Sequence, residues 1–110
     1  MNKYRNRKII YDNINFASRK EGSRYLQLKF LQKNKEISQL RLQVTFELQP
    51  KFKRLNGEKE RSIKYIADFT YYNSDDNFVV EDVKGIKTSV YSLKRKMLLF
   101  KYSDIIFIET

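Results

Sequence analysis

The sequence predicts a protein of the α/β (α+β) class, because helical and strand patterns follow one another along its 110 residues. Apolar residues recur at helical spacing in residues 18–34 and again in residues 88–101. Residues 40–49 alternate between apolar and polar side chains, the pattern of a strand with one buried face. Runs of β-branched and aromatic side chains indicate further strands at residues 65–72, 78–83 and 105–108. The expected order is helix, strand, strand, strand, helix, strand, within a single domain that spans residues 1–110.

Residues 1–17 are expected to form a basic arm that contains a short hairpin. Asp12 and Asn13 are turn-forming residues between two strand-like runs. Ser18 begins the first helix, and Glu21 completes a capping box three residues later. This helix is expected to pack on the sheet through Tyr25, Leu28 and Leu31, with the apolar surface widened by Leu26 and Phe30.

The middle of the chain predicts a long ribbon followed by a central hairpin. Pro50 ends or bends the alternating strand, and Asn56-Gly57 turns the ribbon back. The central hairpin joins residues 65–72 to residues 78–85 through a polar turn. The second helix has Thr88 or Ser89 as its N-cap, and its apolar face is expected to consist of Val90, Leu93, Met97 and Phe100.

Ionisable residues interrupt the otherwise apolar strands of the central hairpin, among them Asp68 in the first strand, and Asp82 and Lys84 in the second. Ionisable side chains within a buried strand cost several kcal/mol unless they are paired or bind a metal. Because side chains alternate across a strand, Asp82 and Lys84 share one face while Glu81 points to the other. Pairing of the two strands would place Asp68 beside Asp82, so that two carboxylates and an ammonium group converge.

The composition restricts the chemistry available to these residues. The chain has no cysteine and no histidine, which excludes disulfides, thiol nucleophiles, imidazole bases and zinc sites built from those side chains. A metal ion must therefore have oxygen ligands, as magnesium, manganese and calcium prefer. Asp68 and Asp82 are the candidate ligands, and Lys84 is a candidate for steadying an attacking water or a phosphate oxygen. A structural ion pair among the same three residues is the alternative.

The chain is strongly basic, with 23 Lys and Arg against 13 Asp and Glu and a net charge of +10. A basic N-terminal third and 16 aromatic residues suit a nucleic-acid backbone, although a solvated lysine-rich surface has a similar composition. The N-terminus lacks the apolar segment of a signal peptide, and no apolar run reaches the ~20 residues of a membrane span. We therefore expect a cytoplasmic protein without a membrane partner.

Four sequence blocks occur in a fixed order: residues 16–25, 46–50, 65–69 and 80–91. They read FASRKE followed by RY, FELQP, YIADF, and VEDVKG followed by KT and Y. Across residues 3–109 these blocks resemble a family of small phage-encoded proteins in the PD-(D/E)XK nuclease superfamily, which are similar to restriction endonucleases and Holliday-junction resolvases. The resemblance implies a restriction-endonuclease-like core with a mixed central sheet between two helices. Ala67 stands where the motif of the superfamily has proline.

The resemblance also implies roles for particular residues. Asp68 matches the acid on the second core strand, Asp82 and Lys84 match the acid-x-Lys on the third, and Glu21 matches the acid on the first helix. All four would be catalytic, and Asp68, Asp82 and Glu21 would hold Mg²⁺ or Mn²⁺. Glu81 is the next-best candidate for the metal ligand assigned to Asp82. For Glu21 the alternative is that its carboxylate only caps the helix, which needs no catalytic role.

The implied activity is a metal-dependent endonuclease that hydrolyses DNA phosphodiester bonds, selecting DNA by its backbone or branched structure, in the cytoplasm of an infected or lysogenic bacterium. A homodimer and contacts with phage replication or recombination proteins are compatible with it. The alternatives are a nucleic-acid-binding protein without catalysis and a replication-accessory protein that keeps the fold. Candidate DNA contacts are Lys3, Arg5, Arg7, Lys8, Arg19, Lys20, Arg24, Lys87, Thr88, Tyr91, Lys94 and Arg95.

Overall fold

The computed structural model describes residues 9–83 and 87–110. No helix in these two ranges is long and apolar enough to cross a membrane. The elements occur in the predicted order, and a short pair of strands at residues 52–53 and 59–60 confirms the ribbon that is expected to turn at Asn56-Gly57. In chain order they are β1 (Ile9–Tyr11), β2 (Ile14–Phe16), α1 (Arg19–Lys33), β3 (Ser38–Gln49), β4 (Phe52–Lys53), β5 (Lys59–Glu60), β6 (Ile63–Tyr72), β7 (Phe78–Asp82), α2 (Ser89–Lys101) and β8 (Ile106–Glu109).

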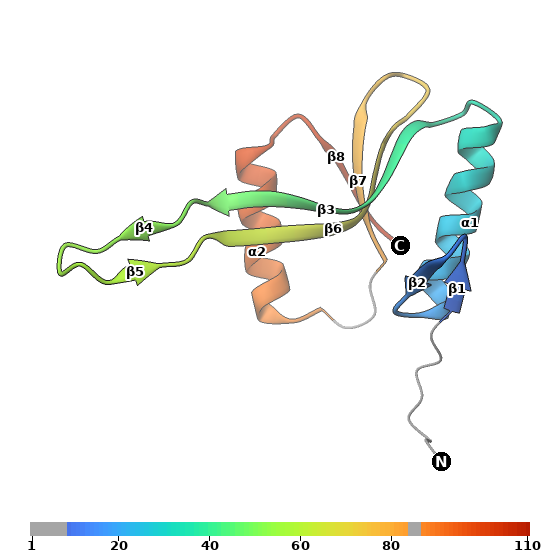
Figure 1. Cartoon of the computed structure of the whole chain (residues 1–110). Helices are drawn as coiled ribbons and strands as arrows, with labels where there is room; N and C mark the ends of the chain where they lie inside the picture. Colours follow the sequence, from blue (N-terminus) through green and yellow to red (C-terminus); the bar gives the residue numbers. More distant parts are fainter. Residues whose placement is uncertain (1–8, 84–86) are drawn as a thin grey trace, which may run out of the picture.

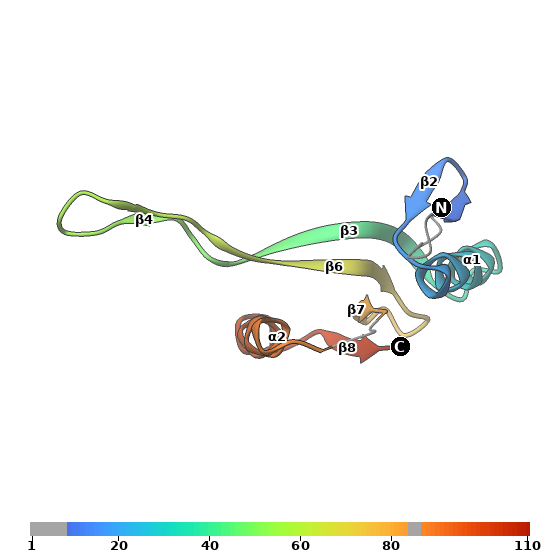
Figure 2. The ribbon, with the colours of Figure 1, turned by 90° about the horizontal axis from the view of Figure 1, so that it is seen from below.

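Strands β3, β6, β7 and β8 form one mixed sheet in that order, in which β7 and β8 are parallel and the other neighbours antiparallel. Helices α1 and α2 cover opposite faces of this sheet (Figure 1, Figure 2). Val79 belongs to the apolar cluster under α1 and Val80 to the cluster under α2, as alternation along a strand requires. The predicted α+β class, with a mixed sheet and two flanking helices, is therefore confirmed.

Side chains that alternate along strand β6 pack against helix α2 in its first half and against helix α1 in its second half. In β6, Tyr65 and Ala67 pack in the α2 cluster, whereas Phe69 and Tyr71 pack in the α1 cluster. Residues two apart on a strand ordinarily face the same side. The change of face between Ala67 and Phe69 lies opposite Gln43 of β3, whose φ of 52° marks an irregular backbone. Asp68 is half-buried at this change of face, between the two apolar clusters. Asp68 is therefore located where the ribbon changes the helix that it packs against.

The predicted N-terminal hairpin and helix cap are both present. Asp12 and Asn13 have φ angles of 53° and 63°, the left-handed conformation that a type I′ turn needs. The Tyr25 hydroxyl donates a hydrogen bond of 2.6 Å to Asp12, and burial together with this carboxylate raises the pKa of Tyr25 to about 12. Ser18 Oγ accepts a hydrogen bond of 3.1 Å from the Glu21 amide. The hairpin is thus fastened to α1, one turn from Glu21.

The predicted apolar faces of the helices are partly wrong. Helix α1 buries Tyr25 and Leu28 as expected, and helix α2 buries Leu98. Because the sheet has only four strands, each helix contacts it along a narrow stripe, and on α2 this stripe lies one position away from the predicted face. The predicted core residues that are exposed instead are Leu26, Phe30, Val90, Leu93 and Phe100.

Strands β4 and β5 extend the β3–β6 ribbon beyond both helices (Figure 1, Figure 2). Phe52 is opposite Glu60 and Lys53 is opposite Lys59, and Gly57 closes the turn with a φ of 90°. The Cα radius of gyration is 16.6 Å, against about 13 Å for a compact domain of this length. We refer to residues 50–62 as the hairpin arm.

Candidate active site

The carboxylates of Asp68 and Asp82 each accept a hydrogen bond from the backbone of the chain segment that carries the other acid. The Asp68 N–H donates a hydrogen bond of 2.9 Å to Asp82 Oδ1, and the Val83 N–H donates one of 2.9 Å to Asp68 Oδ2. These bonds continue the pairing of β6 with β7 beyond the pair formed by Phe69 and Glu81. Asp82 is only 1% exposed, whereas Asp68 is half-buried. The predicted contact between the two acids is confirmed, and backbone donors orient both carboxylates.

Gln43 connects this pair to Glu21 of helix α1. Its side-chain nitrogen donates hydrogen bonds of 3.3 Å to Asp68 Oδ1 and of 3.3 Å to Glu21 Oε2. The backbone φ of Gln43 is 52°, in the left-handed region that non-glycine residues rarely adopt. The amide places partial positive charge between two carboxylates that would otherwise repel each other. Sequence patterns do not mark Gln43, which looks like one more polar residue on the solvent face of β3.

Glu81 points away from Asp82 and is fully buried. Arg24 of helix α1 donates to it from Nε at 2.5 Å and from Nη2 at 3.0 Å, and the Tyr71 hydroxyl donates at 2.6 Å. The hydrogen bond to Glu81 raises the pKa of Arg24, while burial and Glu81 raise the pKa of Tyr71 to about 12. Glu81 is thus engaged in an ion pair between α1 and β7. The structure places Asp82 beside Asp68, as strand alternation indicates.

Glu109, on strand β8, lies beside Asp82 in the parallel ladder. Its carboxylate accepts hydrogen bonds from the Tyr91 hydroxyl and from Lys87 Nζ, the latter at 3.2 Å, and Arg95 lies 3.6 Å away. Three of the predicted DNA contacts therefore converge on one acid. The Tyr91 hydrogen bond is the main reason why the pKa of Glu109 is lowered, and burial with the same bond raises the pKa of Tyr91. A glutamate after an apolar run gives no sequence signal for this role.

Replacing Glu109 by glutamine is expected to lower the free energy of unfolding by about 1 kcal/mol at neutral pH, since a charge-assisted hydrogen bond is lost. The folded pKa of Glu109 is below its unfolded value, so its stabilising effect is complete above the unfolded pKa of about 4.3 and is lost as the pH falls through the folded pKa. Urea unfolding of wild type and the Glu109→Gln variant at several pH values measures this difference in stability. A difference in stability that does not shrink below about pH 4.3 would contradict the assignment.

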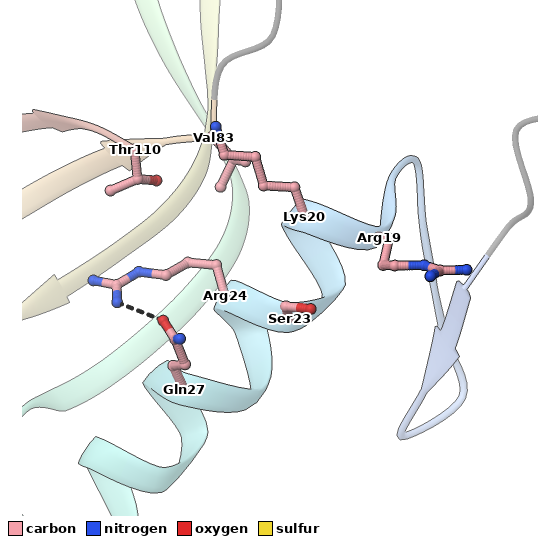
Figure 3. Close-up of a pocket in the computed structure, with 7 residues that line it drawn as sticks. All are labelled: Arg19, Lys20, Ser23, Arg24, Gln27, Val83 and Thr110. Carbon is pink, nitrogen blue, oxygen red and sulfur yellow. Dashed lines mark hydrogen bonds between the residues drawn. The ribbon is translucent and has the colours of Figure 1, made fainter.

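A pocket of about 660 Å³ opens beside the end of β7, on the α1 side. Figure 3 shows Lys20 extending from α1 toward Val83, with Arg24 one turn further along the helix. Arg24 is already bound to Glu81 and Gln27, so its guanidinium is committed within the protein. Arg19 and Lys20, both predicted DNA contacts, line this pocket.

A second pocket, of about 290 Å³, lies on the α2 side of β7 and includes Asp82. Lys64 of β6 and Lys94 of α2 line it together with Thr88, which caps α2 by accepting a hydrogen bond from the Tyr91 amide. The hydroxyl of Tyr65, another lining residue, is buried and has no hydrogen-bond partner among the residues described. Asp82 therefore borders a polar pocket with two nearby lysines. Five predicted site residues lie outside the described ranges, namely Lys3, Arg5, Arg7, Lys8 and Lys84.

The acidic residues fit a hard divalent cation in their chemistry, because all of their donor atoms are carboxylate oxygens. Within residues 9–83 and 87–110, no three acidic side chains form a ready-made metal site. Asp68 and Asp82 are adjacent, and Glu21 reaches the same region through the Gln43 amide, which supplies positive charge where a cation would. Carboxylate oxygens have two lone-pair positions each, so their present hydrogen bonds leave room for a metal. Asp68 and Asp82 are the main candidate ligands, and Glu21 is the third.

A protein-family model described as a protein of unknown function, DUF1064, matches residues 1–108. The chain belongs to the DUF1064 family. No curated protein and no solved structure gives a significant match to it. For this DUF1064 protein, the arrangement of Asp68, Asp82 and Glu21 is therefore the main basis for a functional proposal.

Proposed function

We propose that this DUF1064 protein is a Mg²⁺- or Mn²⁺-dependent endonuclease that hydrolyses DNA phosphodiester bonds. The observation that carries the proposal is the pairing of Asp68 with Asp82 through reciprocal backbone hydrogen bonds. Two adjacent carboxylates beside a buried strand repel each other, and a bound cation would relieve that repulsion. A divalent ion there would polarise a phosphate and lower the pKa of a water molecule, so that hydrolysis needs no histidine.

The surroundings of the two acids support a restriction-endonuclease-like core, as the resemblance to the PD-(D/E)XK superfamily implies. Helix α1, strands β3, β6 and β7, helix α2 and strand β8 follow in the order of that core. Asp68 is on the second of these strands, Asp82 ends the third, and Glu21 is in the first turn of the first helix. Lys84 follows two residues after Asp82 and completes the acid-x-Lys pattern in sequence.

Basic side chains near the acids are suited to holding a phosphate backbone. Lys64 and Lys94 line the pocket that contains Asp82, and Lys20 lines the pocket on the other side of β7. Such contacts position the nucleic acid without reading its bases, so the protein would select DNA by its structure. Branched DNA of the kind formed in phage replication and recombination is the substrate class that we propose.

The direct test is to incubate the protein with supercoiled plasmid, linear duplex, forked DNA and four-way junctions in the presence of Mg²⁺ or Mn²⁺. Cleavage that EDTA stops, and that is faster on the branched DNAs, is the expected result. If none of the four DNA forms is cut with either metal, the proposal is wrong.

Glu21→Gln tests whether this residue belongs to the site or only caps helix α1. The cap uses the Glu21 amide N–H and Ser18 Oγ, so the substitution leaves it intact and stability should change little. Cleavage should fall by about 10- to 100-fold if the carboxylate helps to hold the metal, and a higher metal concentration should restore part of it. Ser18→Ala is the matched control, because it removes the cap, at a cost of about 1 kcal/mol, and keeps the carboxylate. Unchanged cleavage by the glutamine variant would remove Glu21 from the site.

A DNA-binding or replication-accessory protein without catalysis is the second candidate. The observation that favours it is Gln43, whose amide lowers the repulsion between Glu21 and Asp68 without any metal. The two candidates differ in the role of Asp82, since a carboxylate near phosphates weakens binding unless it holds a cation. Removing that charge should therefore only tighten binding in an accessory protein, whereas it should abolish turnover in a nuclease.

A further inference from the structure

The hairpin arm has no core of its own. Residues 50–59 are all exposed, and Leu55 near its tip is fully accessible. A two-stranded ribbon is at best marginally stable by itself in water, and exposed apolar side chains such as Phe52 and Leu55 indicate a surface that is covered when in use. The arm is therefore a candidate binding surface.

The charge of the arm suits a polyanion. Arg54 forms ion pairs with Glu58 and Glu60, at 3.6 and 2.8 Å. In the part of the chain that is described, the other basic residues of the arm have no carboxylate within ion-pair distance. Three of them line a pocket of about 280 Å³ together with Phe52 and Glu60. These unpaired basic residues are Lys51, Lys53, Lys59 and Arg61.

Strand β6 joins the arm to the candidate active site. Lys64, which lines the pocket containing Asp82, is on the same strand as Asp68 and only three residues after Arg61. Positive charge therefore continues from this pocket along the ribbon to the arm. A phosphate backbone bound at Asp82 has a direct path onto the arm.

The length of the arm matches the repeat of duplex DNA. Gly57 at the tip and Asp68 are eleven positions apart, which is about 36 Å of extended chain at ~3.3 Å per residue. One turn of B-DNA is about 34–36 Å long. The tip is thus in reach of phosphates about one turn away from a phosphate at Asp82.

We propose that the hairpin arm lies along duplex DNA and binds its phosphates about one helical turn from the bond that is cut. This assignment rests on the proposed function, because it takes the position of Asp82 as the cutting site. A second copy of the chain is the other occupant to be tested. The charge disfavours it, since two arms that each carry four unpaired basic residues repel one another.

The test compares a variant with all four unpaired basic residues of the arm changed to serine against a variant with the same loss of charge elsewhere. The control carries Lys29, Lys33, Lys35 and Arg41 changed to serine, all exposed residues outside the arm and the candidate site. Binding to a 5-bp duplex closed by a hairpin loop, which is about half a helical turn long, and to a 32-bp duplex is measured by fluorescence anisotropy without divalent metal, over a series of salt concentrations. Sedimentation of each protein reports its oligomeric state.

The arm variant should bind the 32-bp duplex at least tenfold more weakly than wild type, and the 5-bp duplex almost as well as wild type does. The slope of log K against log salt on the long duplex should become shallower by about 0.9 for each phosphate contact that is lost. The control variant should bind both duplexes slightly more weakly than wild type, by the same small factor. Equal losses on both duplexes, losses as large in the control, or an arm variant that differs from wild type only by dissociating a dimer would each overturn the proposal.

Cleavage assays separate this inference from the proposed function. If wild type cuts DNA and the arm variant binds the long duplex like wild type, the arm assignment is wrong and the nuclease proposal stands. If wild type cuts no DNA but the arm variant shows the length-dependent loss of binding, the nuclease proposal is wrong while the arm still binds duplex DNA. Absence of any DNA binding by wild type overturns both.

Discussion

Asp82→Asn is expected to reduce DNA cleavage by about a thousandfold, on the order of the effect of removing a catalytic acid or base. The asparagine side chain is nearly isosteric with aspartate, and its carbonyl oxygen can still accept the hydrogen bond that the Asp68 N–H gives to Asp82 Oδ1. The fold and the β6–β7 pairing should therefore survive while the charge that would bind the metal is lost. Cleavage rates on the preferred DNA, measured at saturating Mg²⁺, together with the thermal unfolding midpoint, test this directly.

Binding gives the Asp82→Asn experiment a second, independent readout. Removing a negative charge beside the pocket that contains Lys64 and Lys94 should leave DNA affinity unchanged or slightly higher in the absence of metal. Asp104→Asn is the matched control, because Asp104 is an exposed aspartate in the turn between α2 and β8. If Asp82→Asn cuts DNA at the wild-type rate, the metal-site proposal is wrong even though the protein binds DNA.

Local patterns were sufficient to predict every element of the sheet and both helices. Alternation also selects Asp82 rather than Glu81 as the neighbour of Asp68, since odd and even residues of a strand face opposite sides. The structure agrees with this placement, because Glu81 is bound to Arg24 on the other face. Whether Asp82 holds a metal is a separate question, and it stays a prediction.

Contacts between distant segments are what the sequence could not supply. Gln43 bridges two acids that are 22 and 25 positions away, and Arg24 reaches across 57 positions to Glu81. Glu109 joins α2 only because β8 returns beside β7. Each of these residues is an ordinary polar residue in its own neighbourhood, so no local pattern distinguishes it from a solvated side chain.

The exposed parts of the molecule were unpredictable for a related reason. Apolar spacing shows that a helix has a face to bury, but the width of the sheet decides how much of that face is covered. Val90, Leu93 and Phe100 have the helical spacing of a core and are exposed, because α2 contacts β3 and β6 along another stripe. The arm likewise continues the ribbon in sequence, and only the tertiary arrangement shows that no helix covers it.

Glu81→Gln is expected to lower the free energy of unfolding by about 3 kcal/mol, because it leaves Arg24 without its charged partner at a buried site. This is the lower end of the range for buried ion pairs, since 24% of the Arg24 side chain is exposed. For a domain of this size the unfolding midpoint should fall by more than about 10 °C. The double substitution Arg24→Met with Glu81→Leu, combined with Tyr71→Phe, should recover much of this loss, because a packed apolar cluster carries no desolvation penalty. Tyr71→Phe is needed because the buried Tyr71 hydroxyl would otherwise lose its Glu81 acceptor.

The same combined variant tests whether the ion pair positions the candidate active site as well as stabilising the fold. Arg24 is one helical turn after Glu21, and Glu81 directly precedes Asp82, so their bond sets the distance between the helix and the strand that carry these two acids. This combined variant should therefore cleave DNA about tenfold more slowly than wild type even at nearly normal stability, with a lower kcat, an unchanged KM for DNA and a higher requirement for Mg²⁺. Wild-type kcat in this variant would show that the pair stabilises the fold without positioning the acids.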